Sequence, residues 1–308
     1  MNVYRHINEF SSKKDVVITT GTFDGVHLGH KKIIEQVVSA AKKINGESVI
    51  LTFFPHPRMV LYPENNDLKL LKTIEERIEL LKSSGIDHLI IHPFSMEFSR
   101  ITSLDFVRDI LVKKLNTKKL VIGYDHHFGK NREGSFQHLK EYGPLYGFDV
   151  EEISAQEIQQ INISSTKVRN SLLIGEIQAA NQFLGYYYFI NGTVVEGEKI
   201  GRKLGFPTAN IKIKEDYKLI PANGVYAVKV NVDEKLYSGM LNIGVRPTVK
   251  GDEVTIEVNI FNFNDQIYNK PIRIEFFEKI RNEIKFNELV DLQQQLNNDK
   301  QKVLQLFS

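Results

Sequence analysis

Two histidines near the N-terminus stand three residues apart in a stretch that also contains three glycines. His27 and His30 lie in the segment Gly21-Thr-Phe-Asp-Gly-Val-His-Leu-Gly-His30. Imidazole N–H groups can donate hydrogen bonds to phosphate oxygens, and such donors help most where negative charge develops in a transition state. The spacing therefore indicates a phosphate-handling site, and a pair of histidines that only cap a turn is the alternative.

A buried strand and an amphipathic helix are predicted on either side of these histidines. The β-branched run Val16–Thr20 predicts the strand, and apolar spacing predicts a helix from about Gly29 to Ile44. The start of a helix presents unpaired N–H groups and the positive end of its dipole, so it favours an anion. A glycine at position 29 lets a nucleotide lie close to the backbone.

The rest of the first half alternates between short apolar runs and helical periods. Further strands are expected at Ser48–Phe54, His88–His92, Lys119–Gly123 and Asp149–Ile153, and helices at Ile74–Ser83 and Leu104–Leu115. This pattern predicts an α/β fold with a doubly wound parallel sheet, whose ligands sit at the carboxyl ends of the strands.

Two of those strand ends carry polar and aromatic residues. Phe54-Pro55-His56-Pro57 ends one strand, and a proline-stiffened exit loop is the alternative to a ligand site there. Asp125-His126-His127-Phe128-Gly129 ends another. Adjacent side chains diverge and no further ligand spacing is present, so we do not expect a metal cluster at this second end.

A hydroxyl-rich helix start follows at Ser164-Ser165-Thr166, with Lys167 and Arg169 in its first turn. Hydroxyls at this position can be ordinary helix caps. The two cations are unfavourable against the helix dipole unless an anion offsets them. We expect this helix to continue to Gly185 and place the domain boundary there, giving domains 1–185 and 186–308.

The second half predicts an antiparallel barrel or sandwich followed by a helix. Strands are expected at Tyr187–Val195, Gly224–Val232, Lys235–Ile243, Val254–Phe263 and Ile272–Ile280. The terminal helix spans Asn287–Phe307, and its expected packing stripe is Leu289, Leu292, Leu296, Val303 and Leu306.

A glycine-rich and basic loop, residues 197–210, lies between the first two of these strands. It includes Gly201, Lys203 and Pro207, and it ends in Thr208-Ala-Asn210. Backbone N–H groups can form a concave anion site in such a loop, and the Thr208 and Asn210 oxygens suit Mg2+. A plain hairpin turn is the alternative. Glu257, on an alternating strand, would by itself be read as an outward polar residue.

Composition limits the class of protein. The 308 residues include no cysteine, which excludes disulfides and thiolate chemistry. The net charge is +2, so no global field favours nucleic acid or an anionic membrane. The first residues contain no apolar signal core and no run approaches the length of a membrane span, so a cytoplasmic protein is expected.

The first half resembles a known enzyme family at the quoted motifs. His27–His30 resembles the HxGH signature of the nucleotidylyltransferase superfamily, and in the longer form GTFDGVHLGH it resembles the FMN adenylyltransferase branch of bacterial bifunctional riboflavin kinase/FAD synthetases. The resemblance implies that both histidines are catalytic. The ATP-binding residues that it implies in this half are Gly21, Phe23, Asp24, His27, His30, Ser164, Ser165, Thr166, Lys167 and Arg169. The flavin contacts that it implies are Phe54, Pro55, His56, Pro57, Asp125 and Phe128, although His126 departs from the family's aromatic.

The second half resembles the riboflavin kinase part of the same family. The resemblance runs from Gly201 to Asn210, which holds the PTAN box, and through the segments at 224–227, 241–248 and 256–261. It implies ATP contacts at Gly201, Lys203 and Pro207, a metal site for Mg2+ at Thr208 and Asn210, and Glu257 as catalytic base. Arg281 is implied as a flavin-loop contact. Asn259 and Asn269 stand where histidine and glycine are more usual.

The expected activity is ATP-dependent phosphorylation of riboflavin to FMN, followed by adenylylation of FMN to FAD with release of pyrophosphate. One alternative is a single-activity nucleotidylyltransferase with a non-catalytic flavin-binding barrel, and another is a flavin-sensing regulator. The expected partners are riboflavin, FMN and ATP, without nucleic acid or membrane, and the sequence leaves a weak homo-oligomer open.

Overall fold

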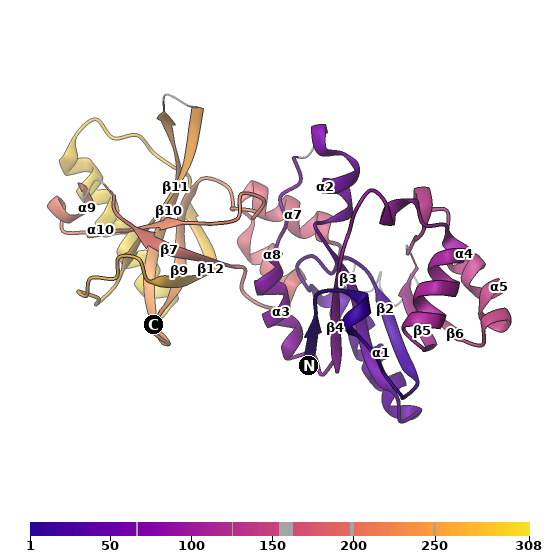
Figure 1. Cartoon of the computed structure of the whole chain (residues 1–308). Helices are drawn as coiled ribbons and strands as arrows, with labels where there is room; N and C mark the ends of the chain where they lie inside the picture. Colours follow the sequence, from indigo (N-terminus) through magenta and orange to yellow (C-terminus); the bar gives the residue numbers. More distant parts are fainter. Residues whose placement is uncertain (66, 125, 154–162, 198–199, 249–250) are drawn as a thin grey trace. The chain divides into compact units, whose positions relative to one another are not determined.

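The computed structural model describes residues 1–65, 67–124, 126–153, 163–197, 200–248 and 251–308. The chain divides into two compact units, Met1–Ser165 and Thr166–Ser308 (Figure 1), and each has its own hydrophobic core.

The first unit is built on a parallel sheet of six strands, in the order β1-β4-β3-β2-β5-β6. The strands are β1 (Asn2–Tyr4), β2 (Val16–Thr20), β3 (Glu47–Phe54), β4 (His88–Pro93), β5 (Thr117–Gly123) and β6 (Asp149–Ile153). The predicted parallel sheet is confirmed. β1 was not predicted, because its three residues gain strand structure only by pairing with β4 at the sheet edge.

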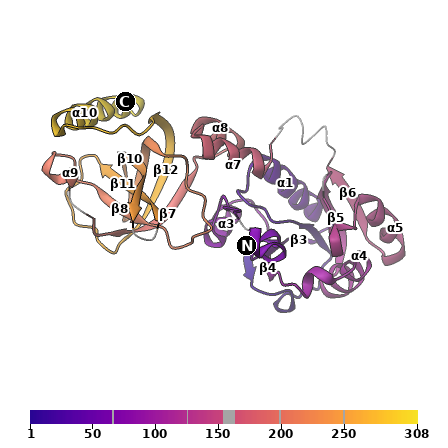
Figure 2. The ribbon, with the colours of Figure 1, turned by 90° about the horizontal axis from the view of Figure 1, so that it is seen from above.

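Helices cover both faces of this sheet (Figure 2). The helices α1 (Leu28–Lys43) and α3 (Ile74–Lys82) pack on one face, and α4 (Ser103–Asp105), the π-helix η4 (Phe106–Lys114) and α5 (Phe136–Tyr146) pack on the other. Alternate strand residues feed the two cores: Val17 and Ile50 face α1, whereas Val16 and Val49 face η4. We did not predict α5, because its internal Gly143 and Pro144 weaken the helical signal.

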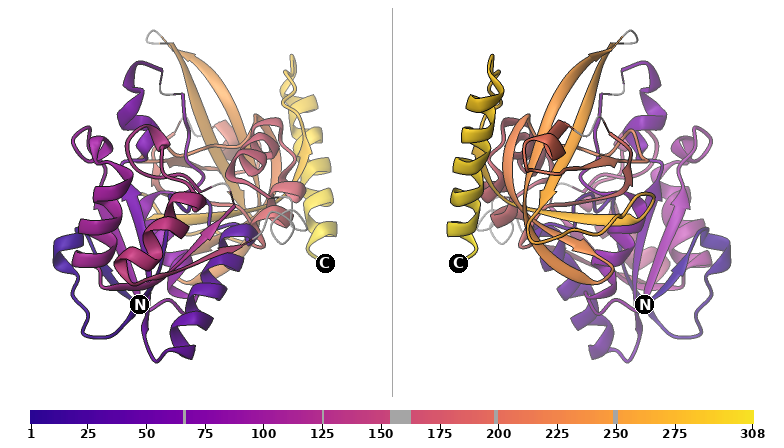
Figure 3. Two further views of the ribbon diagram at one scale, coloured as in Figure 1. Left: turned by 90° about the vertical axis from the view of Figure 1, so that its right-hand side faces the viewer. Right: turned by 90° about the vertical axis from the view of Figure 1, so that its left-hand side faces the viewer.

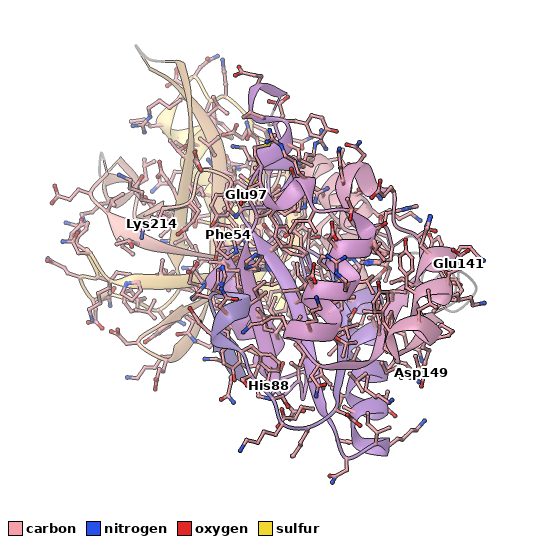
Figure 4. The ribbon with its side chains drawn as sticks, turned by 45° about the vertical axis from the view of Figure 1, so that its right-hand side comes forward. Phe54, His88, Glu97, Glu141, Asp149 and Lys214 are labelled. Carbon is pink, nitrogen blue, oxygen red and sulfur yellow. The ribbon has the colours of Figure 1, made fainter. Side chains whose placement is uncertain are left out.

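The carboxyl ends of the strands form the edge that carries the predicted site. Phe54 ends β3 and His88 begins β4, and Figure 4 shows these two residues at opposite ends of the sheet. Four short helices complete the loops: η1 (Ile7–Glu9), α2 (Pro57–Leu61), η2 (Pro63–Asn65) and η3 (Phe98–Arg100). A further 3-10 turn, η5, covers Lys130–Arg132.

The helix expected to run to Gly185 is two helices, so that prediction is wrong. α7 covers Ser165–Ile174 and α8 covers Ile177–Leu184. The break occurs at Gly175, whose φ of +84° is a left-handed conformation that favours glycine and ends α7. Gly185 ends α8 in the same way, as predicted.

Both of these helices are held by the second unit. The Ala222 N–H donates to the Leu172 carbonyl at 3.0 Å, and the Asn181 side chain donates to the Phe276 carbonyl at 2.9 Å. The division between the compact units therefore falls at residue 165, whereas the sequence placed the boundary at 185. As a boundary between functions, residue 185 stays a prediction.

The second unit is a closed barrel in the order β10-β11-β8-β7-β12-β9, with every pair antiparallel. Its strands are β7 (Phe189–Val195), β8 (Ala209–Lys212), β9 (Gly224–Val232), β10 (Lys235–Thr248), β11 (Gly251–Ile260) and β12 (Pro271–Arg281). Because the sheet closes on itself, the second unit is the barrel and not the sandwich of the two predicted architectures. We did not predict β8, since it begins inside the glycine-rich loop at 197–210 and its four residues form a strand by pairing with β7 and β11.

The terminal helix α10 (Leu289–Leu306) lies along the outside of the barrel (Figure 3). Val303 is fully buried against Phe206 and Phe261, and Leu296 packs beside them. Leu289 is 64% exposed and Leu306 is 46% exposed, so the predicted stripe is wrong at both ends. The buried face is centred on Val303 and Asp299 one turn earlier, which leaves the terminal turns in solvent.

Candidate functional sites

The two histidines of the first unit face the same way, as their spacing predicted. The centres of their rings are 3.7 Å apart and the ring planes are within 15° of parallel. His27 is also the N-cap of α1, because its Nδ1 accepts a hydrogen bond from the backbone N–H of His30 at 3.3 Å. His27 therefore caps α1 and also lies nearly parallel to His30, so capping and a common orientation of the two rings occur together.

Burial keeps both imidazoles neutral. Desolvation lowers the pKa of His27 to about 4, against a smaller raising effect of the Asp24 charge. Desolvation also places the pKa of His30 well below its usual value, and electrostatic interactions with the neighbouring His27 and with the Arg77 guanidinium lower it further. His30 Nδ1 is buried and has no hydrogen-bond partner among the residues that the structure describes. At neutral pH each ring can therefore donate one N–H without carrying a charge.

The loop before the histidines has an unusual backbone. Phe23 and Val26 have φ values of +48° and +42°, in the left-handed region, and Gly25 between them has a φ of +89°. The Phe23 side chain is 3% exposed, and its ring lies 5.0 Å from that of His30. A Cβ on Gly21 would lie 3.2 Å from the Phe23 ring. Gly21 and Phe23 thus shape the loop, and their contact with ATP stays a prediction.

Asp24 is a buried brace for the same loop. It is 2% exposed, and its carboxylate accepts hydrogen bonds from the backbone N–H groups of Leu71 at 3.0 Å and Lys72 at 3.1 Å. Its carbonyl accepts a hydrogen bond from Ser165 Oγ at 2.8 Å. A hydrogen bond therefore links Ser165 to the histidine loop. The ATP contact of Asp24 stays a prediction.

The remaining residues of the hydroxyl-rich helix start lie on both sides of the division between the units. Ser164 immediately precedes α7 in the first unit, and Thr166, Lys167 and Arg169 lie in the first turns of α7 in the second unit. Their role at the phosphates stays a prediction.

The predicted flavin residues of the first unit fall into two groups. Phe54 ends β3 and is joined to Pro55 by a cis peptide bond, and His56 and Pro57 form the start of α2. Phe128 is 8% exposed and packs with Phe106 at a ring distance of 5.7 Å, so it belongs to the core. Asp125 lies outside the described residues.

His126 stands at the position where the resemblance implies an aromatic residue. Its ring lies 5.9 Å from that of Phe128 at an angle of 19°, and its Nε2 is 3.1 Å from Thr20 Oγ1. The imidazole at position 126 therefore packs against an aromatic ring in this chain. Within the described ranges, no group of three or more His, Asp or Glu residues is arranged to hold a metal ion.

We expect the first unit to lose stability as the pH falls from about 6.5 to about 4. Burial lowers the pKa of His27, His92 and His126 to about 4, while the unfolded chain titrates near 6.5. The unfolded state therefore binds more protons in this window, and each imidazole contributes a loss of at most about 1.4 kcal/mol per pH unit. Hydrogen exchange of β2 and α1, measured in the full chain at several pH values, checks this.

The control for this pH dependence is His92→Phe, because His92 packs at ring distances of 4.5 Å from His6 and 4.7 Å from Phe98. This variant should show a shallower dependence on pH. An unchanged slope would show that His92 titrates normally in the folded protein.

The second unit brings Glu257 together with the predicted metal residues. Thr208 Oγ1 donates a hydrogen bond to Glu257 Oε2 at 3.1 Å. Asn210 on β8 is the direct cross-strand partner of Glu257 on β11. The side chains of direct partners share one face of a sheet, so a hydroxyl, an amide and a carboxylate lie side by side. All three residues were predicted from the sequence.

Asn242 was not among the predicted site residues. It is the partner of Glu257 on the other side, on β10, and its Nδ2 donates to Glu283 Oε1 at 3.4 Å. Only the register of the barrel shows this neighbour, because 15 positions along the chain separate Asn242 from Glu257.

The glycine-rich loop before β8 is partly helical. The short helix α9 covers Ile200–Lys203, and a Cβ on Gly201 would lie 2.3 Å from the Phe206 carbonyl oxygen. The Pro207 carbonyl accepts a hydrogen bond from Asn259 Nδ2 at 2.7 Å. Asn259, which departs from the family pattern, thus anchors this loop. The side chain of Lys203 lies outside the described part of the chain.

Arg281, the predicted flavin contact, is engaged in a buried ion pair. Its Nε lies 2.9 Å and its Nη2 lies 2.8 Å from Asp299 Oδ2, and the Asp299 side chain is fully buried. This pair ties β12 to α10. The flavin contact of Arg281 stays a prediction.

We expect Asp299→Asn to destabilise the second unit by about 3 kcal/mol, because it removes a fully buried counter-charge from the Arg281 guanidinium, which is only 14% exposed. Hydrogen exchange of α10 and β12 in the full chain measures the effect. The double variant Arg281→Met/Asp299→Leu should recover much of the loss. A single variant as stable as the wild type would show that the pair contributes little.

Together, these features define a class of protein. A parallel α/β unit with paired imidazoles at a helix start is joined in one chain to a closed barrel with a Thr, Asn and Glu cluster, which is the arrangement of a two-domain nucleotide-dependent transferase. The FAD synthetase family matches residues 9–167, and the riboflavin kinase family matches residues 184–307. The chain belongs to the bifunctional riboflavin kinase/FMN adenylyltransferase family.

Curated relatives match over nearly their whole length. The bifunctional riboflavin kinase/FMN adenylyltransferase of Listeria monocytogenes is 39% identical, covering 95% of this chain and 92% of its own. The relative of the same name from Escherichia coli is 34% identical, covering 100% and 98%.

A solved structure shows the same fold. The crystal structure described as a macrolide-efflux protein from Streptococcus pneumoniae has a TM-score of 0.89 and is 32% identical, covering 97% of both chains. The description as an efflux protein is that of the Streptococcus pneumoniae protein, and only the likeness in fold and sequence applies to this chain. Among the residues described for this chain, no helix is long and apolar enough to span a bilayer.

Proposed function

We propose that this chain phosphorylates riboflavin to FMN and then adenylylates FMN to FAD, with ATP as the phosphoryl and adenylyl donor. The observation that carries the proposal is that one chain contains both family domains in order, each with its polar cluster assembled. Relatives that are named for both activities match this chain over more than nine-tenths of their own length.

In the second unit, we assign Glu257 as the base that takes the proton from the ribityl hydroxyl of riboflavin. The freed oxygen attacks the γ-phosphorus of ATP, and ADP leaves. The Thr208 hydroxyl, 3.1 Å from the Glu257 carboxylate, orients this base. Gly201, Lys203 and Pro207 belong to the loop assigned to ATP.

The donor set beside Glu257 fits Mg2+. Thr208 and Asn210 offer a hydroxyl and an amide oxygen, which are hard ligands of the kind that this ion prefers, next to a carboxylate. When bound, the ion would neutralise charge on the phosphates of ATP. The protein's own part is to hold those two oxygens beside Glu257, one from the residue that precedes β8 and one from β8 itself.

In the first unit, we assign His27 and His30 as donors to the α-phosphate of a second ATP. The FMN phosphate attacks this phosphorus and pyrophosphate leaves, so negative charge builds up where neutral N–H donors can stabilise it. Ser164, Ser165, Thr166, Lys167 and Arg169 are assigned to the departing phosphates. Phe54 to Pro57, with Asp125 and Phe128, are assigned to the flavin, and Arg281 to the flavin of the kinase step.

The test is incubation of the protein with riboflavin, ATP and Mg2+, followed by separation of the flavins. We expect FMN first and FAD later. FAD formed from supplied FMN without any FMN formed from riboflavin would favour the single-activity alternative. Flavin binding without any turnover would favour a flavin-sensing regulator. As parts of the same proposal, we place the enzyme in the cytoplasm and leave a weak homo-oligomer as a prediction.

A further inference from the structure

A buried arginine lies behind the histidine loop and has no role in the reaction described above. Arg77 belongs to α3, in a segment whose start is fixed by a capping box between Thr73 and Glu76. The Arg77 side chain is 2% exposed. An arginine is costly to bury unless its guanidinium is used for hydrogen bonds, so its contacts indicate what it does there.

The guanidinium contacts the first part of the histidine loop. Arg77 Nη1 donates to the Thr22 carbonyl oxygen and to Thr52 Oγ1, the latter at 3.1 Å. Thr52 Oγ1 in turn donates to the same Thr22 carbonyl at 3.2 Å. One backbone carbonyl is therefore held from two directions, by a cation on α3 and by a hydroxyl on β3.

The held carbonyl immediately precedes the strained part of the loop. Phe23 and Val26 adopt left-handed φ values of +48° and +42°. Such conformations cost a non-glycine residue about 1 to 3 kcal/mol and persist only where the surrounding structure fixes them. Thr22 is fixed by Arg77 on one side of Phe23, and the Asp24 carboxylate is fixed by the N–H groups of Leu71 and Lys72 on the other.

The same loop sets the start of α1 and so the positions of the imidazoles. Val26, with its left-handed φ, directly precedes His27, the N-cap of α1. The Arg77 charge also reaches the second imidazole, where it contributes to keeping the pKa of His30 low. Arg77 thus affects both the geometry and the protonation of the pair without itself being exposed.

We propose that Arg77 is a positioning residue for adenylyl transfer, which fixes the Thr22 carbonyl and so holds the loop that presents His27 and His30 to the phosphates of ATP. This inference rests on the proposed adenylylation of FMN. A purely structural role, in which Arg77 only stabilises the α/β fold, is the competing explanation.

The test compares Arg77→Met and Arg77→Lys with the wild type in the full chain, using FMN, ATP and Mg2+. We expect kcat for FAD formation to fall by about 100-fold in Arg77→Met, because small displacements of catalytic groups have effects of this size. The KM for FMN and the phosphorylation of riboflavin should not change. Arg77→Lys should retain only part of the rate, since one ammonium group cannot reproduce the guanidinium contacts.

Two readouts separate positioning from folding. In Arg77→Met the pKa of His30 loses one lowering influence, so the acid limb of the pH–rate profile should move to higher pH. The second readout uses Arg77→Ala, which leaves space for a guanidinium ion. Guanidinium ion at low concentration should partly restore FAD formation to this variant, and NaCl of equal ionic strength should not. A destabilised but otherwise normal site would show neither effect.

Arg108→Met is the matched control, because Arg108 is an arginine of the same unit whose ion pairs with Asp105 and Asp109 are at the surface. It should leave FAD formation unchanged. The inference is overturned if Arg77→Met forms FAD at the wild-type rate with the wild-type pH profile. If the wild type itself forms no FAD from FMN, the proposed function fails instead, which is a different result.

Discussion

Replacing His27 with alanine stops flavin processing at FMN, with FAD formation reduced by about 100- to 1,000-fold and riboflavin phosphorylation unchanged. The expected size follows from the loss of one neutral hydrogen-bond donor to a transition state, in a site where burial lowers the pKa of that donor to about 4. The measurement is the rate of FAD formation from supplied FMN, alongside the rate of FMN formation from riboflavin.

The matched control separates the imidazole from the helix cap. His27 caps α1 by accepting a hydrogen bond from the His30 N–H, and asparagine can make a cap of the same kind. His27→Asn should therefore keep the stability that His27→Ala loses, about 1 kcal/mol, and still lose FAD formation. If His27→Asn adenylylates FMN at the wild-type rate, His27 is a structural cap and the assignment of a catalytic pair is wrong.

Replacing Glu257 with glutamine blocks riboflavin phosphorylation by about 100- to 10,000-fold, because the amide cannot accept the hydroxyl proton. FAD should still form from supplied FMN. Glutamine keeps an oxygen that can accept the hydrogen bond from Thr208 Oγ1, so the loop before β8 should keep its place. The measurement is FMN formation from riboflavin, with FAD formation from FMN as the internal comparison.

Thr208→Val is the companion variant, because it removes the hydroxyl that contacts Glu257 and keeps the shape of the side chain. It should raise the Mg2+ concentration needed for the kinase step.

Loss of adenylylation in Glu257→Gln would contradict the assignment of two separate sites.

Most of the first unit could be read from the sequence, because its signals are local. The β-branched run at Val16–Thr20 and the apolar period of α1 are each confirmed. β1 could not be read in this way, because it depends on pairing with β4. The break between α7 and α8 was also missed, although Gly175 is a signal that could have indicated it.

The candidate sites also contain some residues that local sequence signals predict and others that depend on contacts between distant segments. His27 and His30 stack because a spacing of three at a helix start brings two side chains together, and this is visible in sequence. Arg77 was not recognised, because a charged residue in a helical pattern is normally exposed, whereas this one is 2% exposed. The ion pair of Arg281 with Asp299 joins residues from a strand and a helix that share no local pattern.

By itself, the sequence determined the parallel α/β class of the first unit, the antiparallel β class of the second, the pairing of the two imidazoles and the family, since these depend on period, spacing and motif. Only the tertiary structure decided that the barrel is closed, that Asn242 lies beside Glu257, and that Asp24 and Arg77 brace the histidine loop. The physical reason is that hydrogen bonds and burial between distant segments depend on strand register and helix packing. A residue's own neighbours in the chain do not specify either of these.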